Sequence, residues 1–201
     1  MKNNKLILTG ALLLGSVLGS NAQMVIDNTT QSPQQLVQNV LVGSGVTILN
    51  VEFNNSIPLA NVPQTMVGYF DATATTFPIP EGVILATGNA IVAIGPNNSS
   101  SATNNTGAAA DPNDADMAQI GSPYVQNDEA ILEFDFIPTG DSVVFNYVFA
   151  SEEYHEYSTS SFNDGFGFII SGPGFAGPFL NGGVNIAVIP GTGGLPVTMN
   201  N

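Results

Sequence analysis

A cluster of oxygen-bearing side chains lies in residues 150–166, which read ASEEYHEYSTSSFNDGF. Glu152 and Glu153 begin the cluster, and Asn163 and Asp164 close it after a serine-rich turn. Carboxylate and amide oxygens are hard ligands that suit calcium, which accepts about six to eight of them in flexible geometry. We therefore predict a calcium site, in which the turn folds back and brings Asn163 and Asp164 beside the two glutamates.

The charge balance of the chain favours a cation at this cluster. The sequence holds 16 Asp and Glu residues against two Lys and Arg residues, and nine of the acids fall between Asp128 and Asp164. Two carboxylates about 6 Å apart repel by roughly 3 kcal/mol at an effective dielectric constant of about 20. Such a cluster is either neutralised by a metal ion or spread into solvent, and the sequence leaves both alternatives open.

A second acidic stretch, DPNDAD at residues 111–116, is reminiscent of a calcium-binding loop. Asp114 and Asp116 have the right ligand chemistry. The stretch departs from the helix–loop–helix calcium pattern, because Ala115 stands at the fifth ligand position and Asp116 replaces the required glycine. Asp114 and Asp116 are candidate ligands, and the alternative is that they are solvated charges that keep the protein soluble.

The first cluster also carries aromatic side chains, namely Tyr154, Tyr157 and Phe162. Aromatic faces stack on sugar rings in lectin-like modules, so these three are candidate ligand-binding residues. A small aromatic core beneath the loop explains them as well, and we favour that interpretation.

An enzymatic role for the cluster is weakly supported. His155 is the only histidine of the chain and has the chemistry of a general base or a metal ligand. No recognisable nucleophile accompanies it, so an exposed loop side chain is the simpler interpretation. Glu152 and Glu153 do not fit a glycosidase pair, because adjacent residues of a strand point in opposite directions.

The N-terminus has the three parts of a secretory signal: Lys2 and Lys5, an apolar run over residues 6–18, and a small-residue cleavage site that ends at Ala22. We predict residues 1–22 to be a signal peptide, and a secreted or cell-surface protein without membrane insertion after cleavage. The mature chain then has no Lys or Arg, which excludes nucleic acid as a partner. The lack of cysteine excludes disulfides and thiol chemistry.

The elements that position these residues are mostly strands. After a polar leader at residues 23–34, Ser32 and Gln35 form a capping box around Pro33, which predicts one short helix that ends at Gly43. Strand candidates with a period of two, bounded by Gly, Pro and Asn, follow at 46–54, 66–70, 82–88, 130–138, 142–150, 165–171 and 184–190. The pattern predicts an all-β fold, an antiparallel β-sandwich of jelly-roll type.

Two of these strand candidates have informative patterns. In residues 130–138, Leu132, Phe134 and Phe136 are expected to face inward, and Glu133 and Asp135 to face outward. Residues 142–150 are apolar on both faces, which is typical of a central strand that is covered on both sides. Between them and the N-terminal strands, residues 96–123 predict a long loop.

The motifs LVQNVLVGSGVTILNVEF, GVILATG, DADM, NDEAILEFDFIPTGDSVVFNYVFASEEYHEY, SSFNDGFGFIISGPG and NIAVIPG occur in this order. Together they resemble the choice-of-anchor L domain of secreted bacterial proteins, from about Gln35 to the end of the chain. The resemblance implies an exported surface protein with a C-terminal sorting or anchoring signal, such as a type IX secretion sorting domain. The family motif carries over to Glu152, Glu153, Asn163 and Asp164 and, with a looser match, to Asp114, Asp116 and Asp128.

The sequence departs from the family pattern at its end. It stops at PVTMNN, where family domains continue through further strands. We therefore expect residues 35–201 to form a domain that is incomplete at its C-terminus and that lacks its anchor domain. The triplet Asp141-Ser142-Val143 resembles an O-glycosylation site, and a turn followed by a strand explains it equally well.

These observations predict a non-enzymatic surface module, stabilised by calcium and serving adhesion through a glycan or a surface protein. Two alternatives remain at this stage. One is a carboxylate-based glycoside hydrolase, and the other is a structural spacer that presents another domain.

Overall fold

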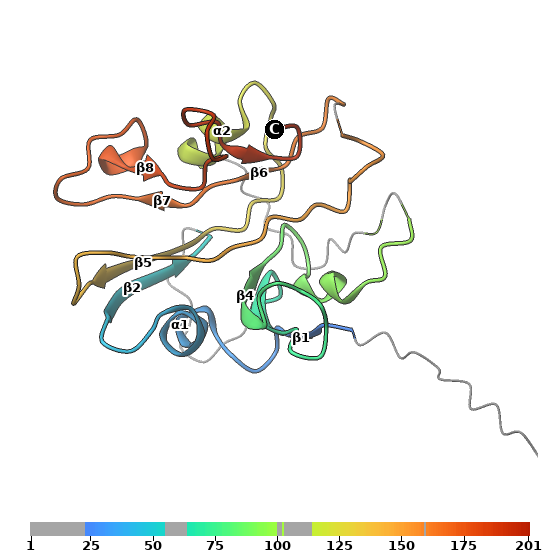
Figure 1. Ribbon diagram of the computed structural model, residues 1–201, viewed down its shortest axis with the longest axis horizontal. Coiled ribbons are helices and arrows are strands. Elements are labelled where there is room, and N and C mark those ends of the chain that lie inside the picture. Colours follow the sequence, from blue (N-terminus) through green and yellow to red (C-terminus); the bar gives the residue numbers. More distant parts are fainter. Residues whose placement is uncertain (1–22, 55–63, 100–101, 103–113, 159) are drawn as a thin grey trace, which may run out of the picture.

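The computed structural model describes residues 23–54, 64–99, 102, 114–158 and 160–201. The chain is all-β, as predicted: its strands pair antiparallel, and only short helices accompany them. The described strands form one sheet of order β1-β3-β4 and three pairs, β2-β5, β6-β9 and β7-β8. In Figure 1 the β1-β3-β4 sheet and helix α1 lie on one side of the β2-β5 pair, and the strands from β6 onward lie on the other.

The first sheet consists of β1 (Val25–Asp27), β3 (Val67–Asp71) and β4 (Glu81–Leu85). Strand β1 lies within the segment that the sequence predicts to be a polar leader. It is ordered because Ile26 joins a buried cluster with Phe70, Ala72 and Ala90. Burial of these apolar groups anchors the N-terminal end of the described chain to the sheet.

The predicted capping box is confirmed in helix α1 (Pro33–Leu36). The Ser32 hydroxyl accepts from the Gln35 backbone N–H, and the Gln35 side chain accepts from the Ser32 N–H. A π-helical turn, η1 (Val37–Leu41), extends the helix, which ends at Val42. Val42 is the C-cap and Gly43 follows it directly, which confirms the predicted end of the helix at Gly43. Leu36 and Val37 are fully buried, so the helix is a packing element.

Strands β2 (Thr47–Phe53) and β5 (Leu132–Ile137) pair in antiparallel register with an irregularity between Leu49 and Glu52. Their pairing confirms two of the predicted strands. The alternation in β5 is also confirmed, because Leu132, Phe134 and Phe136 are half-buried while Glu133 and Asp135 are exposed.

The prediction of a single helix is wrong. Helix α2 (Ala115–Gly121) lies inside the region predicted to be a long loop. Asp114 caps its N-terminus, and Ile120 buries its side chain near Gly165 of β6 (Gly165–Phe166). Short 3-10 helices also occur at η2 (Ala90–Ile94) and η3 (Leu180–Gly182). The acidic DADM sequence thus begins a helix, with Asp114 at its N-cap.

The C-terminal strands are shorter than the sequence predicts. Strand β6 pairs with β9 (Val197–Thr198), and β7 (Ile169–Ile170) pairs with β8 (Val184–Asn185). The predicted strand at 165–171 is split in two, and the one at 184–190 covers only its first two residues.

Residues 142–150 contradict the prediction of a covered central strand. Among the residues that the structure describes, none pairs with this segment in a sheet. Its alternate side chains do point to opposite sides: Phe145 packs on Phe168, and Tyr147 and Phe149 pack on Phe166. The other face, which includes Val144, is exposed. We call residues 142–150 the edge segment.

Candidate functional site

The fold-back predicted for residues 150–166 is present in the structure. The hydroxyl of Ser151 donates to Asp164 Oδ2 at 2.7 Å and accepts from the Glu153 backbone N–H at 3.2 Å. The strand end at β9 fixes the other side of the turn, because Met199 N donates to the Asp164 carbonyl at 2.8 Å. We call Glu152, Glu153 and Asp164 the acidic turn.

Two carboxylate oxygens of the acidic turn are buried without a donor. Glu152 Oε2 and Glu153 Oε2 have no hydrogen-bond partner in the described part of the chain. Burial raises the pKa of both carboxyl groups, and the charge of Asp164 raises it further. The remaining contributions to the raised pKa come from Glu156 for Glu152 and from Glu152 for Glu153. The acidic turn therefore favours any species that neutralises it, a proton or a cation.

The predicted calcium ligands do not form a preassembled cage. Across the described ranges, no group of three or more His, Cys, Asp and Glu side chains is positioned to hold a metal ion. Asn163 lies next to the acidic turn, but its Oδ1 accepts from the Asn200 backbone N–H at 3.0 Å. A cation at this place requires the three carboxylates to draw closer together.

Asp114 and Asp116 have structural partners of their own. Asp114 Oδ1 accepts from Asp116 N at 2.9 Å and from Met117 N at 2.8 Å, which caps helix α2. Asp116 Oδ1 accepts from Leu180 N at 2.8 Å and so ties the helix to a segment far along the chain. These carboxylates stabilise the fold by accepting hydrogen bonds from backbone N–H groups.

A second acidic group surrounds Glu133, and the sequence did not indicate it. Glu133 is exposed as a whole residue, but partial burial of its carboxyl group raises the pKa, and the charges of Asp114, Glu52 and Asp116 raise it further. Glu52 lies directly across from Glu133 in the β2-β5 ladder. The structure thus groups Asp114 and Asp116 with Glu133. The alternation of the strand predicted that Glu133 faces outward, but it could not show that Glu52 lies across from it.

Glu129 is the most deeply buried acid of the described residues, at 6% exposure, and no sequence pattern indicated it. Its Oε2 accepts from the Asp114 backbone N–H at 3.2 Å. Asp128, a candidate ligand, is half-buried beside it with a left-handed backbone at φ 56°. Asp is one of the few residues that adopt this conformation readily, so a turn explains Asp128.

The aromatic residues of the turn are partly paired. Tyr157 and Phe162 meet edge to face, with ring centroids 5.7 Å apart, yet Phe162 remains 56% exposed. Tyr154 is exposed as well. The pair matches the predicted small aromatic core on one side and leaves apolar ring surface open on the other. His155 is exposed, and its carbonyl accepts from the Ser158 hydroxyl at 2.9 Å.

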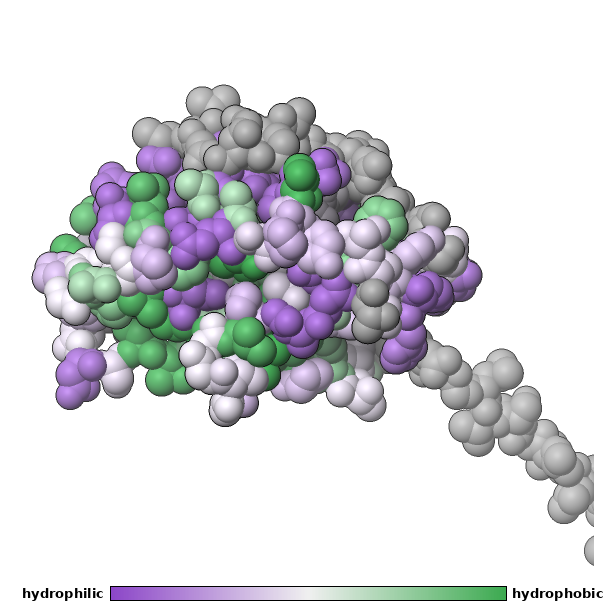
Figure 2. Space-filling view, turned by 90° about the horizontal axis from the view of Figure 1, so that it is seen from above, coloured by the Kyte–Doolittle hydropathy of each residue, from purple (hydrophilic) through white to green (hydrophobic). Residues whose placement is uncertain are grey.

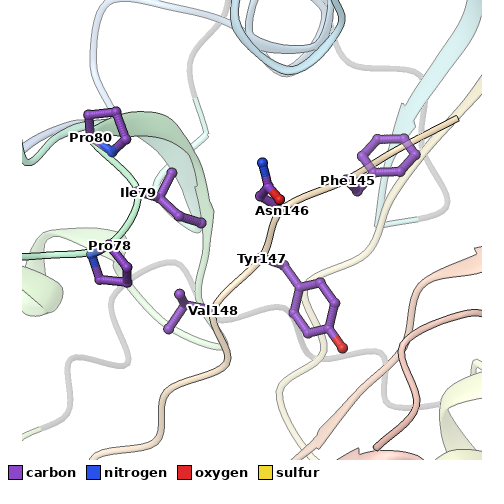
Figure 3. Close-up of a pocket in the computed structure, with 7 residues that line it drawn as sticks. All are labelled: Pro78, Ile79, Pro80, Phe145, Asn146, Tyr147 and Val148. Carbon is purple, nitrogen blue, oxygen red and sulfur yellow. The ribbon is translucent and has the colours of Figure 1, made fainter. Parts of the chain in front are cut away.

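A cleft lies between the edge segment and the loop before β4, and the sequence analysis did not predict it. Its volume is about 580 Å³, and residues 78–80 and 145–148 line it. Figure 3 shows Ile79 and Val148 projecting toward the space between the two segments, while the Tyr147 ring turns away from the prolines. No charged side chain lines the cleft.

The antiparallel strands define an all-β module. The profile of the Choice-of-anchor L domain matches residues 25–201, and the chain therefore belongs to this family. The family consists of secreted or cell-surface proteins and is not known for enzymatic activity, so the chain is an extracellular surface module. No curated protein and no solved structure matches the chain.

Two predictions about targeting stand apart from the structure. The predicted signal peptide at residues 1–22 lies outside the described residues. Within the described ranges, the structure contains no helix of the length and hydrophobicity needed to cross a membrane.

Proposed function

We propose that the chain is a non-enzymatic extracellular module whose acidic turn binds calcium, and that the ion fixes the turn for contact with a glycan or a surface protein. One observation carries the proposal. Glu152 and Glu153 each bury a carboxylate oxygen without a donor, next to Asp164. The chain beyond Lys5 contains no lysine or arginine that could neutralise them.

The chemistry of the donors supports calcium over other divalent ions. The acidic turn offers carboxylate oxygens, and the Ser151 hydroxyl lies within hydrogen-bond distance of Asp164. All of these are hard oxygen ligands, and the described chain ranges place no His beside them except the exposed His155. Calcium tolerates irregular coordination with several waters, whereas magnesium demands a near-ideal octahedron. Flexible coordination suits a site that assembles only when the ion arrives.

Calcium and protons compete for the same oxygens. Because the pKa values of Glu152 and Glu153 are raised, protonation relieves the repulsion at acidic pH. At higher pH both groups ionise and the repulsion returns, so calcium affinity should rise with pH. The aromatic rings of Tyr157 and Phe162, on the same turn, would then be held in one arrangement for a ligand.

The test is the melting temperature of the exported protein in EDTA and in millimolar calcium or magnesium, with bound metal measured by mass spectrometry. A ligand that binds only the native state stabilises it by about 2.7 kcal/mol at a concentration of 100 times Kd. We expect calcium to raise the melting temperature and Glu153→Gln to abolish the rise. Glu133→Gln is the matched control, since Glu133 is also a glutamate of raised pKa but belongs to the other acidic group.

Either of two outcomes would contradict the calcium proposal. One is a melting temperature that is the same in EDTA and in calcium, with no metal bound. The other is a calcium effect that Glu133→Gln removes as effectively as Glu153→Gln. The first outcome favours the structural spacer over the binding module.

A further inference from the structure

The edge segment leaves its backbone groups open. Within the described part of the chain, residues 142–150 make no backbone hydrogen bond to another segment, although Figure 1 shows them running as an extended trace after β5. All of these residues except Phe145 and Phe149 are exposed, so their backbone groups are accessible to another chain. An apolar extended run without a ladder is therefore a template for an additional strand.

The two faces of the edge segment are covered differently. The aromatic face packs on Phe166 and Phe168. The opposite face carries Val144, which is 83% exposed, and Val148, which is 45% exposed. Figure 2 shows, on one face of the molecule, apolar residues exposed between hydrophilic ones. The aromatic face therefore packs through its rings, although Val143 and Tyr147 on it are still 42% and 41% exposed, and the outer face is most open at Val144.

The opposite wall of the cleft, residues 78–80, cannot pair with the edge segment as a regular strand. Residues 78–80 read Pro-Ile-Pro, so two of the three lack a backbone N–H. Proline cannot donate to a strand pair. Natural edge strands are protected by lysine, proline or bulges, and residues 142–150 contain no lysine and no proline.

Negative charge at both ends of the edge segment favours a partner strand with basic residues at its ends. Asp141 precedes the segment, and Glu152 and Glu153 follow it. A strand of this length spans about 30 Å at about 3.3 Å per residue, so a paired strand meets carboxylates near both of its ends. Lysine or arginine at those positions of a partner would be attracted, and acidic residues would be repelled.

The same charges disfavour a second copy of this chain. Antiparallel self-pairing centred on Asn146 places Asp141 opposite Ser151, next to Glu152 of the other copy. The chain offers no lysine or arginine beyond Lys5 to offset that repulsion. A partner that supplies its own basic residues avoids it.

We propose that the edge segment binds an extended strand of a partner protein, a strand with β-branched residues at its centre and lysine or arginine at both ends. Backbone hydrogen bonds to residues 142–150 supply affinity, and the apolar cleft beside Val148 receives alternate side chains. The inference goes beyond the calcium proposal, since it assigns a class of partner. Both use Glu152 and Glu153, so the binding experiment is carried out in EDTA to separate them.

The probe is a fluorescent synthetic peptide with a Val-Thr repeat at its centre and two Lys or Arg residues at each end. Its control carries Glu in place of each basic residue. We expect the basic peptide to bind the exported protein at least about tenfold more tightly in fluorescence anisotropy, with affinity falling as salt screens the end charges. Hydrogen exchange read by mass spectrometry should show protection of residues 142–150 in the complex.

Two variants test the strand geometry. Val144→Pro removes a backbone donor from the edge segment and should weaken binding at least about tenfold. Val125→Pro is the matched control, because Val125 is also 83% exposed and lies outside the segment. Val148→Asn, which removes an apolar contact and leaves the backbone intact, should weaken binding several-fold and serves if Val144→Pro does not fold.

Four results would overturn the proposal. The first two are equal affinity for the basic and acidic peptides, and normal binding by both Val144→Pro and Val148→Asn. The third is hydrogen exchange in which the peptide protects amides only outside residues 142–150. The fourth is a stable dimer in sedimentation experiments that buries the segment without peptide. Failure of the calcium experiment leaves these readouts unchanged, because they are made in EDTA.

Discussion

At the scale of single residues, Glu152 and Glu153 differ from acids such as Asp27 in having a buried carboxylate oxygen with no hydrogen-bond donor among the described residues. Several acids of the described chain accept hydrogen bonds from backbone or hydroxyl donors. Asp27, for example, accepts from Thr29 and Thr30, which lowers the pKa of its carboxyl group. Glu152 and Glu153 instead keep one buried oxygen each without a donor, and their pKa values are raised.

The raised pKa of Glu153 predicts how stability depends on pH in EDTA. The folded state holds its proton more tightly than the unfolded state, so the free energy of unfolding falls as pH rises from the ordinary value of 4.5 through the raised pKa. Glu153→Gln removes this penalty and should raise the melting temperature at neutral pH. It should change little at pH 4. Melting curves at both pH values check this, and a destabilised variant at neutral pH would contradict it.

Asp114 is predicted to act as a helix cap and not as a calcium ligand. Asp114→Ala removes the acceptor for Asp116 N and Met117 N and should cost about 1 kcal/mol, equally in EDTA and in calcium. Asp114→Asn, which keeps the accepting oxygen, should cost much less. Thermal melts of both variants decide the matter, and a loss seen only in calcium would return Asp114 to the list of ligands.

At the scale of elements, strands β1 and β3 pack so closely at Gly68 that they leave no room for a methyl group there. A Cβ on Gly68 of β3 would lie 2.8 Å from the Asp27 carbonyl oxygen of β1 and 3.0 Å from Asn28 Cβ. Asn28 is held in place because its side-chain amide donates to the Thr65 carbonyl and to Asn89 Oδ1. Asp27 is held by the β1-β3 ladder and Asn28 by its hydrogen bonds, so neither can move away from an added methyl group without breaking these contacts.

Gly68→Ala should therefore destabilise the protein by about 1–3 kcal/mol, because it separates β1 from β3. Gly140→Ala is the matched control, since a Cβ on Gly140 has no neighbour within 4 Å. The measurement is the midpoint of urea unfolding for both variants. Equal midpoints would show that β1 moves aside without cost.

The whole molecule is dominated by charge of one sign. The formal net charge is −14, and both lysines lie within residues 1–22. Self-repulsion of this kind opposes the compact state and is screened by salt. We expect sodium chloride at about 0.5 M to raise the melting temperature in EDTA by a few degrees. Calcium at equal ionic strength should raise it further, and a salt effect as large as that of calcium would argue against a specific site.

Much of the local structure could be predicted from the sequence. The capping box of α1 joins residues three apart, so its side chains are placed by helix geometry alone. The alternation of β5 follows in the same way from the period of a strand. Family membership and an extracellular location were also predicted, since they depend on motif order and not on packing.

Only the tertiary structure decided which acids act together. Glu133 meets Glu52 through strand pairing, and Asp116 meets Leu180 across 64 residues of sequence. The same applies to the edge segment, whose apolar pattern predicted a covered strand and whose outer face is open. Periodicity and capping are fixed by interactions a few residues apart, and so they can be read along the chain. Contacts between distant segments depend on how all the elements pack, and no local pattern specifies them.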